Sequence, residues 1–289
     1  MNTEYIRLCS IPCAGEDQGG EGMIRVFPTR TKWTPTDNLA FVGDPPLFRP
    51  KEQPVMVSVS FTWDIEEGKR LFRAWSEFFP DVQIGGPAFG DAGDDFVSGR
   101  YIKAGVTITS RGCPKRCEGC FVSSREGKTR ELPIVDGNIV QDNNLLACSR
   151  KHIEAVCEML KRQKKAAIFS GGLDVDFLCD WHINLFLSMR IAALWFACDH
   201  YKAIKKVREI VPMLADFPKY KRRCYCMIGK DETYGQAKER LEAVYAMGFF
   251  PFAQLYRGDS PISYSQAWKD LARKWSRPAA YNTEDTDHA

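Results

Sequence analysis

The sequence predicts an α/β protein: an open, partial barrel of parallel β/α units, preceded by a small N-terminal α/β cap. Runs of β-branched and aromatic residues alternate with segments whose apolar residues recur at helical spacing. This alternation is typical of a parallel sheet with helices packed on it. A complete (β/α)8 barrel typically needs about 250 residues, and the alternating units after residue 100 are too few for one. We therefore expect a barrel that does not close.

Residues 1–100 are expected to form the cap. Its first half is rich in glycine and proline and predicts an irregular leader with one short strand at Met23–Phe27. Val55–Phe61 is a β-branched run with strand character, and Asp64 can cap the helix that follows it. A further strand at Val82–Ile84 completes one β–α–β unit, in which parallel pairing is expected.

Residues 101–278 are expected to form the barrel, and residues 279–289 a polar tail. The expected strands are 106–109, 167–169, 194–197, 224–228 and 249–256. One expected helix follows Ser149, which caps it, and another ends before Gly248. Three more cover 177–189, 201–214 and 263–274.

Composition and charge exclude several classes of protein. The chain has 289 residues, 44% of them hydrophobic, which is sufficient for a sizeable core. Lysine and arginine number 40 against 37 acidic residues, so charge alone does not indicate nucleic acid. Neither a targeting segment nor a membrane span is visible, and we expect a cytoplasmic protein. The 11 cysteines are an odd number in a chain too long to need disulfides, so burial or metal binding is expected for them.

Three cysteines, Cys113, Cys117 and Cys120, follow a predicted strand with the spacing C-x3-C-x2-C. Thiolates hold iron–sulfur clusters, and three of them on a four-iron cubane leave one iron open for another ligand. Gly112 and Pro114 supply the turns that let the thiols converge. The alternatives are a zinc site, which needs a fourth ligand, and cysteines without a metal.

With this spacing, the chain resembles the radical S-adenosylmethionine superfamily over roughly residues 100–275. The segment Ser170-Gly171-Gly172 resembles the glycine-rich motif whose backbone meets the methionine amino group in that superfamily. Ile228-Gly229, followed by Glu232-Thr233, resembles a segment common in the cobalamin-binding branch.

Two further segments extend the resemblance to the cobalamin-binding branch. Gly258–Pro261 lies where that branch often has a Pro-Gly-Thr-Pro segment, and Ile84–Pro87 ends a unit resembling part of its cobalamin-binding domain. The N-terminal domain would be a truncated form of it. All four histidines lie outside residues 1–100, so that domain offers no histidine ligand, and we do not expect cobalamin to bind.

The resemblance implies a cofactor set and a reaction. A 4Fe–4S cluster on Cys113, Cys117 and Cys120 would bind S-adenosylmethionine and reductively cleave it to methionine and a 5′-deoxyadenosyl radical. That radical would take a hydrogen atom from an unidentified substrate. The implied partners are an electron donor such as flavodoxin or ferredoxin, and a large substrate, such as a peptide or nucleic acid, at the open mouth of the barrel.

Other polar residues follow a predicted strand, as Asp199 does, or lie on the last one, as Gln254 and Tyr256 do; the carboxyl ends of such strands are where these folds keep their sites. Asp199 is a candidate for a ribose hydroxyl or for the N-cap of the next helix. Gln254 and Tyr256 are candidates for substrate contact or for hydrogen bonds within the core. Cys224 and Cys226 share one strand face. We expect them in the core rather than as thiols that donate a hydrogen atom to a radical.

Two rival functions stay open at this point. One is a cobalamin-dependent radical methylase, which predicts a bound corrinoid. The other is a non-catalytic zinc or iron–sulfur protein, which predicts a fourth protein ligand. Cys9 and Cys13 could belong to a second cluster, but the sequence shows only two ligands there.

Overall fold

The computed structural model describes residues 22–91, 93–117, 120–257 and 262–281. The chain folds into two compact units, Met1–Gly137 and Asn138–Ala289. Both contain parallel β-strands packed against helices, which confirms the predicted α/β class. The expected boundary near residue 100 falls inside the first unit. Within the described ranges, no helix combines the length and the apolar character that crossing a bilayer requires.

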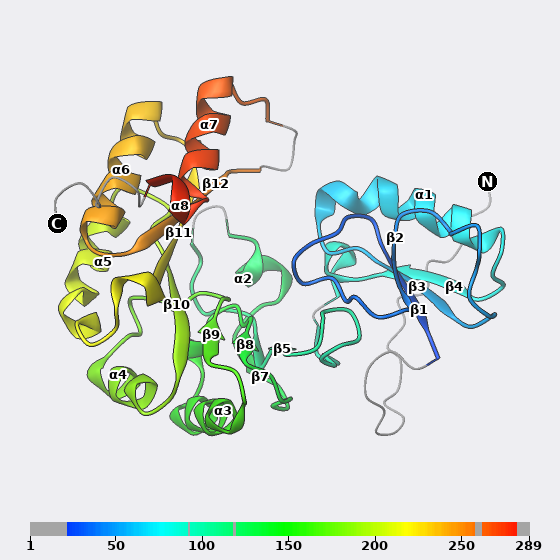
Figure 1. Cartoon of the computed structure of the whole chain (residues 1–289), viewed down its shortest axis with the longest axis horizontal. Coiled ribbons are helices and arrows are strands. Elements are labelled where there is room, and N and C mark those ends of the chain that lie inside the picture. Colours follow the sequence, from blue (N-terminus) through cyan, green and yellow to red (C-terminus); the bar gives the residue numbers. More distant parts are fainter. Residues whose placement is uncertain (1–21, 92, 118–119, 258–261, 282–289) are drawn as a thin grey trace. The chain divides into compact units, whose positions relative to one another are not determined.

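The first unit contains a four-stranded parallel sheet in the order β2-β1-β3-β4. The strands are β1 (Ile24–Phe27), β2 (Ala40–Val42), β3 (Val55–Ser58) and β4 (Val82–Gly85). A short 3-10 helix, η1 (Thr62–Asp64), leads into α1 (Ile65–Ser76), the crossover between β3 and β4. Helix α1 runs along one side of this sheet (Figure 1).

The core of the first unit lies between α1 and the sheet. Leu71 and Trp75 stand one helical turn apart and are fully buried, as the helical spacing predicts. The indole of Trp75 stacks on Phe79 and donates a hydrogen bond of 3.1 Å to the carbonyl of Gly43. Removing such a buried indole typically costs about 3–5 kcal/mol. Helix α1 approaches β3 closely, because a Cβ on Gly68 would lie 2.5 Å from the side chain of Val59.

The sheet is larger than the single β–α–β unit that the sequence predicts. Strand β1 confirms the expected strand at Met23–Phe27, and β2 is an additional strand of three residues. Strand β3 ends at Ser58, before the expected end at Phe61. Asp64 stands at the N-cap of α1 but makes no capping bond, because its carboxylate accepts a 3.1 Å hydrogen bond from Thr29.

The remainder of the first unit consists of short elements. They are η2 (Pro87–Phe89), β5 (Val106–Thr107), β6 (Ser110–Arg111), α2 (Val122–Arg125) and β7 (Arg130–Glu131). Strands β6 and β7 pair antiparallel, and the segment between them contains the cysteine motif.

The second unit contributes five strands to a parallel sheet, adjacent in the order β12-β11-β10-β9-β8. These strands are β8 (Ile139–Val140), β9 (Ala167–Phe169), β10 (Ile191–Ala197), β11 (Arg222–Ile228) and β12 (Phe250–Leu255). The α-helices are α3 (Arg150–Arg162), α4 (Asp180–Leu187), α5 (Ala203–Ile210), α6 (Tyr234–Ala246), α7 (Gln266–Trp275) and α8 (Pro278–Tyr281). The 3-10 helices are η3 (Leu145–Ala147), η4 (Pro212–Leu214) and η5 (Lys219–Lys221).

The two faces of this sheet differ in burial. In β11, Cys224, Cys226 and Ile228 are fully buried on the face that α6 covers, whereas Tyr225 between them is only half-buried. Figure 1 shows α4, α5 and α6 along this side of the strands. The burial of Cys224 and Cys226 confirms their expected place in the core. The opposite face carries stacked rings: Trp195 and Tyr225 lie 4.3 Å apart between centroids.

The predicted strands and helices of the second unit occur with shifted ends. Ser149 caps α3 as expected, accepting a 3.3 Å hydrogen bond from the backbone of His152. Helix α4 begins at Asp180 rather than at 177, because the N-cap is Cys179, whose backbone donates to His182. Gly248 ends α6 at a φ of 83°, which favours glycine.

Candidate functional site

The cysteine motif occupies the loop between β6 and α2. Gly112 begins it with a φ of 78°, and a Cβ there would lie 2.2 Å from the carbonyl oxygen of Lys128. Only glycine fits this close approach. The backbone N–H of Cys113 donates to Gly127 at 3.0 Å, and that of Cys120 donates to Cys117 at 3.1 Å. Hydrogen bonds therefore hold both ends of the motif.

Charged side chains fix the base of this loop. Arg111 lies 3.8 Å from the carboxylate of Glu126, and both side chains are largely buried. Glu126 also accepts a hydrogen bond of 3.4 Å from the backbone of Gly112. Arg130 pairs with Asp94 at 2.7 Å and donates to the carbonyl of Glu126. Two arginines and one glutamate thus anchor the turn that presents the thiols.

The chemistry of the three donors fits an iron–sulfur cluster. Thiols are the groups that bind such clusters, and Cys117 and Cys120 are exposed while Cys113 is half-buried. Across the described ranges, no three His, Cys, Asp or Glu side chains gather closely enough to hold a metal ion. Glu118 and Gly119, between the second and third cysteine, lie outside the described residues.

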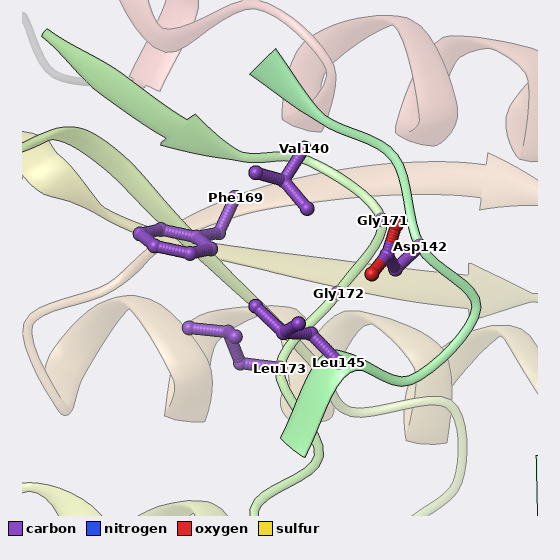
Figure 2. A pocket seen from close by; sticks show the side chains of 7 residues that line it. All are labelled: Val140, Asp142, Leu145, Phe169, Gly171, Gly172 and Leu173. Atoms are coloured by element: carbon purple, nitrogen blue, oxygen red, sulfur yellow. The ribbon is translucent and has the colours of Figure 1, made fainter. Parts of the chain in front are cut away.

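The glycine-rich segment of the second unit follows β9 and packs against the segment after β8, as Figure 2 shows. A Cβ on Gly171 would lie 1.9 Å from the backbone oxygen of Asp142, so glycine is required for packing alone. Gly172 has a φ of 101°, and nothing lies within 4 Å of the place its Cβ would take. The hollow that these residues line with Val140, Leu145, Phe169 and Leu173 is too small for a water molecule.

Ser170, the first residue of this segment, is buried and hydrogen-bonded. Its hydroxyl donates to Gln141 at 2.6 Å, and its carbonyl accepts from the hydroxyl of Tyr225 at 2.9 Å. Burial raises the pKa of Tyr225 to about 12. The phenol therefore stays protonated at neutral pH and donates to the backbone of the glycine-rich segment.

Asp199 follows β10 and joins it to the neighbouring strand. Its exposed carboxylate accepts a 2.8 Å hydrogen bond from the backbone N–H of Met227. Helix α5 begins at Ala203 after Lys202, so the alternative that Asp199 is its N-cap is wrong. The carboxylate is fixed at the carboxyl end of two strands, where a ribose hydroxyl remains its predicted partner.

Buried contacts fix Ile228 and Gly229 at the carboxyl end of β11. The backbone N–H of Gly229 donates to Glu232 at 3.0 Å, and Glu232 pairs with the fully buried Arg240 at 2.7 Å. Arg240 also donates to the carbonyls of Met227 and Cys198. The ring of Tyr264 covers Gly229, since a Cβ there would lie 2.6 Å from it.

Gln254 and Tyr256 lie at the carboxyl end of β12. Gln254 is exposed, so the alternative of a hydrogen bond within the core is wrong for it. Tyr256 is half-buried, with its backbone paired to Ile228 at 2.9 Å and the ammonium of Lys230 lying 5.5 Å from its ring centre. The segment Gly258–Pro261, which was compared with the Pro-Gly-Thr-Pro segment of the cobalamin-binding branch, lies outside the described residues.

The second unit therefore gathers its candidate residues at one edge. Ser170, Asp199, Gly229 and Tyr256 follow four strands that are parallel neighbours, so they share the carboxyl edge of the sheet. The three cysteines belong to the first unit and are described there.

Three residues that contact the candidate site, Arg240, Gln141 and Tyr264, were not predicted from the sequence. Arg240 left a signal that could have been used, because a charged residue stands among Ala237, Leu241 and Val244 on the apolar face of a helix. Gln141 and Tyr264 lie in short polar segments without periodicity, and no sequence pattern distinguishes them.

No family model matches the chain, and no curated protein is similar to it at a significant level.

Proposed function

We propose that the protein is a radical S-adenosylmethionine enzyme, in which Cys113, Cys117 and Cys120 hold one 4Fe–4S cluster. The observation that carries the proposal is the C-x3-C-x2-C spacing in an exposed loop fixed by Gly112. When bound, the cluster would supply the electron that cleaves the carbon–sulfur bond of the sulfonium. An open barrel is the arrangement we propose around it.

The residues at the carboxyl edge would bind and orient the cofactor and the substrate. The backbone of Gly172, beside which there is open space, would receive the methionine end of S-adenosylmethionine. Asp199 and the Ile228-Gly229 turn would contact the nucleoside. The exposed amide of Gln254 and the ring of Tyr256 would face the substrate.

The test is anaerobic purification with iron and sulfide analysis, followed by reduction with dithionite in the presence of S-adenosylmethionine. We expect about four irons per chain and release of 5′-deoxyadenosine. Cys117→Ala should lower the iron content and abolish 5′-deoxyadenosine. The matched control is Cys179→Ser, which removes another exposed thiol but keeps a side chain that caps α4. Stoichiometric zinc without cleavage, the same in both variants, would overturn the proposal.

One observation favours the cobalamin-dependent alternative. The order β2-β1-β3-β4 places a topological switch point between β1 and β3, and open parallel sheets bind ligands at such points. The chain would then be a radical methylase whose first unit carries a corrinoid. Equilibrium dialysis with hydroxocobalamin tests this alternative function. Absence of retained corrinoid would refute it without affecting the cluster assignment.

A further inference from the structure

A cavity of about 430 Å³ lies at the amino edge of the second unit's sheet. Lys219, Tyr220, Tyr245, Gly248, Phe249 and Phe250 line it. Lys219 and Tyr220 precede β11 in η5, and Gly248 and Phe249 precede β12. Because β11 and β12 are parallel, both segments lie at the edge opposite to the carboxyl ends. The cavity is therefore distinct from the site proposed above, and its volume is in the range of small-molecule sites.

The cavity is positively charged. Lys219 lines it, and the guanidinium of Arg222 is anchored beside it by bonds to the carbonyls of Phe217 at 2.7 Å and Ala215 at 3.2 Å. Arg222 is only 9% exposed, and burial holds its pKa below the ordinary value. Within the part of the chain that the structure describes, neither Lys219 nor Arg222 has a carboxylate as an ion-pair partner. A buried cation that contacts only carbonyls favours an anion nearby.

Gly248 connects the arginine to the cavity. A Cβ at this lining residue would lie 3.5 Å from Nη1 of Arg222 and 3.8 Å from Cε of Lys219, the carbon that carries the ammonium. Nη1 is the guanidinium nitrogen that the two carbonyls do not engage. Both cations therefore lie next to the same residue of the cavity wall.

The aromatic part of the wall is rigid. The ring of Tyr245 contacts Tyr281 at 5.5 Å and Trp275 at 6.0 Å between centroids, and Phe250 contacts Tyr281 at 6.1 Å. The hydroxyl of Tyr281 is bonded to the carbonyl of Pro251. Tyr220 is 56% exposed at the entrance, so its ring is available to a ligand. Fixed aromatic walls bind planar rings at a low cost in ordering.

We propose that this cavity binds a small anion that carries a planar aromatic ring, with a nucleoside monophosphate as its model ligand. The phosphate would contact Lys219 and Nη1 of Arg222, and the ring would lie against Tyr220 and Tyr245. No chemical step is involved, and the site works independently of the cluster.

The experiment is isothermal titration of the full chain with AMP, adenosine and ribose 5-phosphate. We expect AMP to bind more tightly than either fragment. Lys219→Ala and Tyr220→Ala should each raise the Kd for AMP about tenfold. Lys205→Ala, which removes an exposed charge from α5 but not from the cavity wall, should leave the Kd within about twofold.

Several results would overturn the proposal. They are absence of AMP binding at millimolar concentration, equal binding of adenosine and AMP, and equal losses in Lys219→Ala and Lys205→Ala. Titration in the presence of excess S-adenosylmethionine separates the two sites. Displacement of AMP would place its site at the carboxyl edge and contradict the proposal. If AMP binding is unchanged and the chain does not cleave S-adenosylmethionine, the proposed AMP site is supported and the proposed enzymatic function is refuted.

Discussion

Gly171 illustrates how one residue can serve packing and a proposed site at once. Its α-carbon faces the backbone of Asp142 so closely that a methyl group would overlap the carbonyl oxygen, at 1.9 Å. The glycine-rich motif therefore has a structural explanation that does not depend on a cofactor. Gly172, with open space beside it, is the position where contact with a ligand is sterically possible.

Gly171→Ala should lower the free energy of unfolding by about 3 kcal/mol, because the segments after β8 and β9 must move apart. Urea denaturation followed by circular dichroism measures this. Gly235→Ala is the matched control: the position lies in the first turn of α6, where the nearest atom to an added Cβ is 3.9 Å away. It should be neutral or stabilising by up to about 1 kcal/mol. Equal effects in both variants would contradict the packing argument.

At the scale of elements, the pair Glu232–Arg240 joins α6 to two strands. Arg240 reaches from α6 to the carbonyls that end β10 and β11, and Glu232 compensates its charge. The arginine side chain is fully buried and the glutamate side chain is 12% exposed. Losing one member of a buried pair costs more than the pair contributes, because the other charge stays buried.

Glu232→Gln should therefore lower the free energy of unfolding by about 3–5 kcal/mol. The control is Glu242→Gln, which breaks the exposed pair with Lys238 on the same helix and should cost about 0.5 kcal/mol or less. Chemical denaturation of both variants measures these two changes in the free energy of unfolding. A small effect in Glu232→Gln would show that water or a carbonyl replaces the carboxylate.

The elements that the sequence predicted are those with a strong hydrophobic period. Helices α1 and α3 were found because apolar residues recur at helical spacing along them, and β11 because its seven residues include an apolar run long enough to indicate a strand. Strands β2 and β8 have three and two residues, too few for a period to show. Their formation depends on pairing with neighbouring strands, and a local sequence pattern does not predict that pairing.

The candidate site was predictable to the same extent. The sequence predicted Asp199, Gly229 and Tyr256 after or at the ends of consecutive strands, and the parallel order puts them at one edge. It gave no indication that Glu232 would be engaged by Arg240 or that Tyr264 would cover Gly229. These contacts join residues through tertiary packing, and local patterns do not encode them.

At the scale of the whole molecule, two buried phenols make the fold sensitive to alkaline pH. Burial raises the pKa of Tyr225 and of Tyr281 to about 12, against about 10 in the unfolded chain. Above pH 10 the unfolded state loses these protons first, so folding stability falls as the pH rises toward 12. Below about pH 9 both phenols are protonated in both states, and their contribution is constant.

We therefore expect the free energy of unfolding to fall by about 2–3 kcal/mol for Tyr225 alone between pH 9.5 and pH 12. Urea denaturation at several pH values, with the phenolate absorbance recorded in parallel, measures this. Tyr225→Phe should lose about 1 kcal/mol at neutral pH, with the bond to Ser170, and should show a shallower alkaline decline. A decline unchanged in Tyr225→Phe would contradict the assignment.

The same burial divides the described cysteines into two populations. Burial raises the pKa of the Cys157 and Cys198 thiols to about 12, while Cys117 and Cys120 are exposed. Alkylation requires a thiolate that a reagent can reach. In the folded chain at neutral pH, a maleimide dye should consequently label the exposed Cys117, Cys120 and Cys179 while sparing the buried thiols. In a Cys179→Ser background, the cysteine motif can therefore carry a fluorescent or spin probe without removal of the buried thiols. Labelling of Cys157 and Cys198 would then report on unfolding of the second unit.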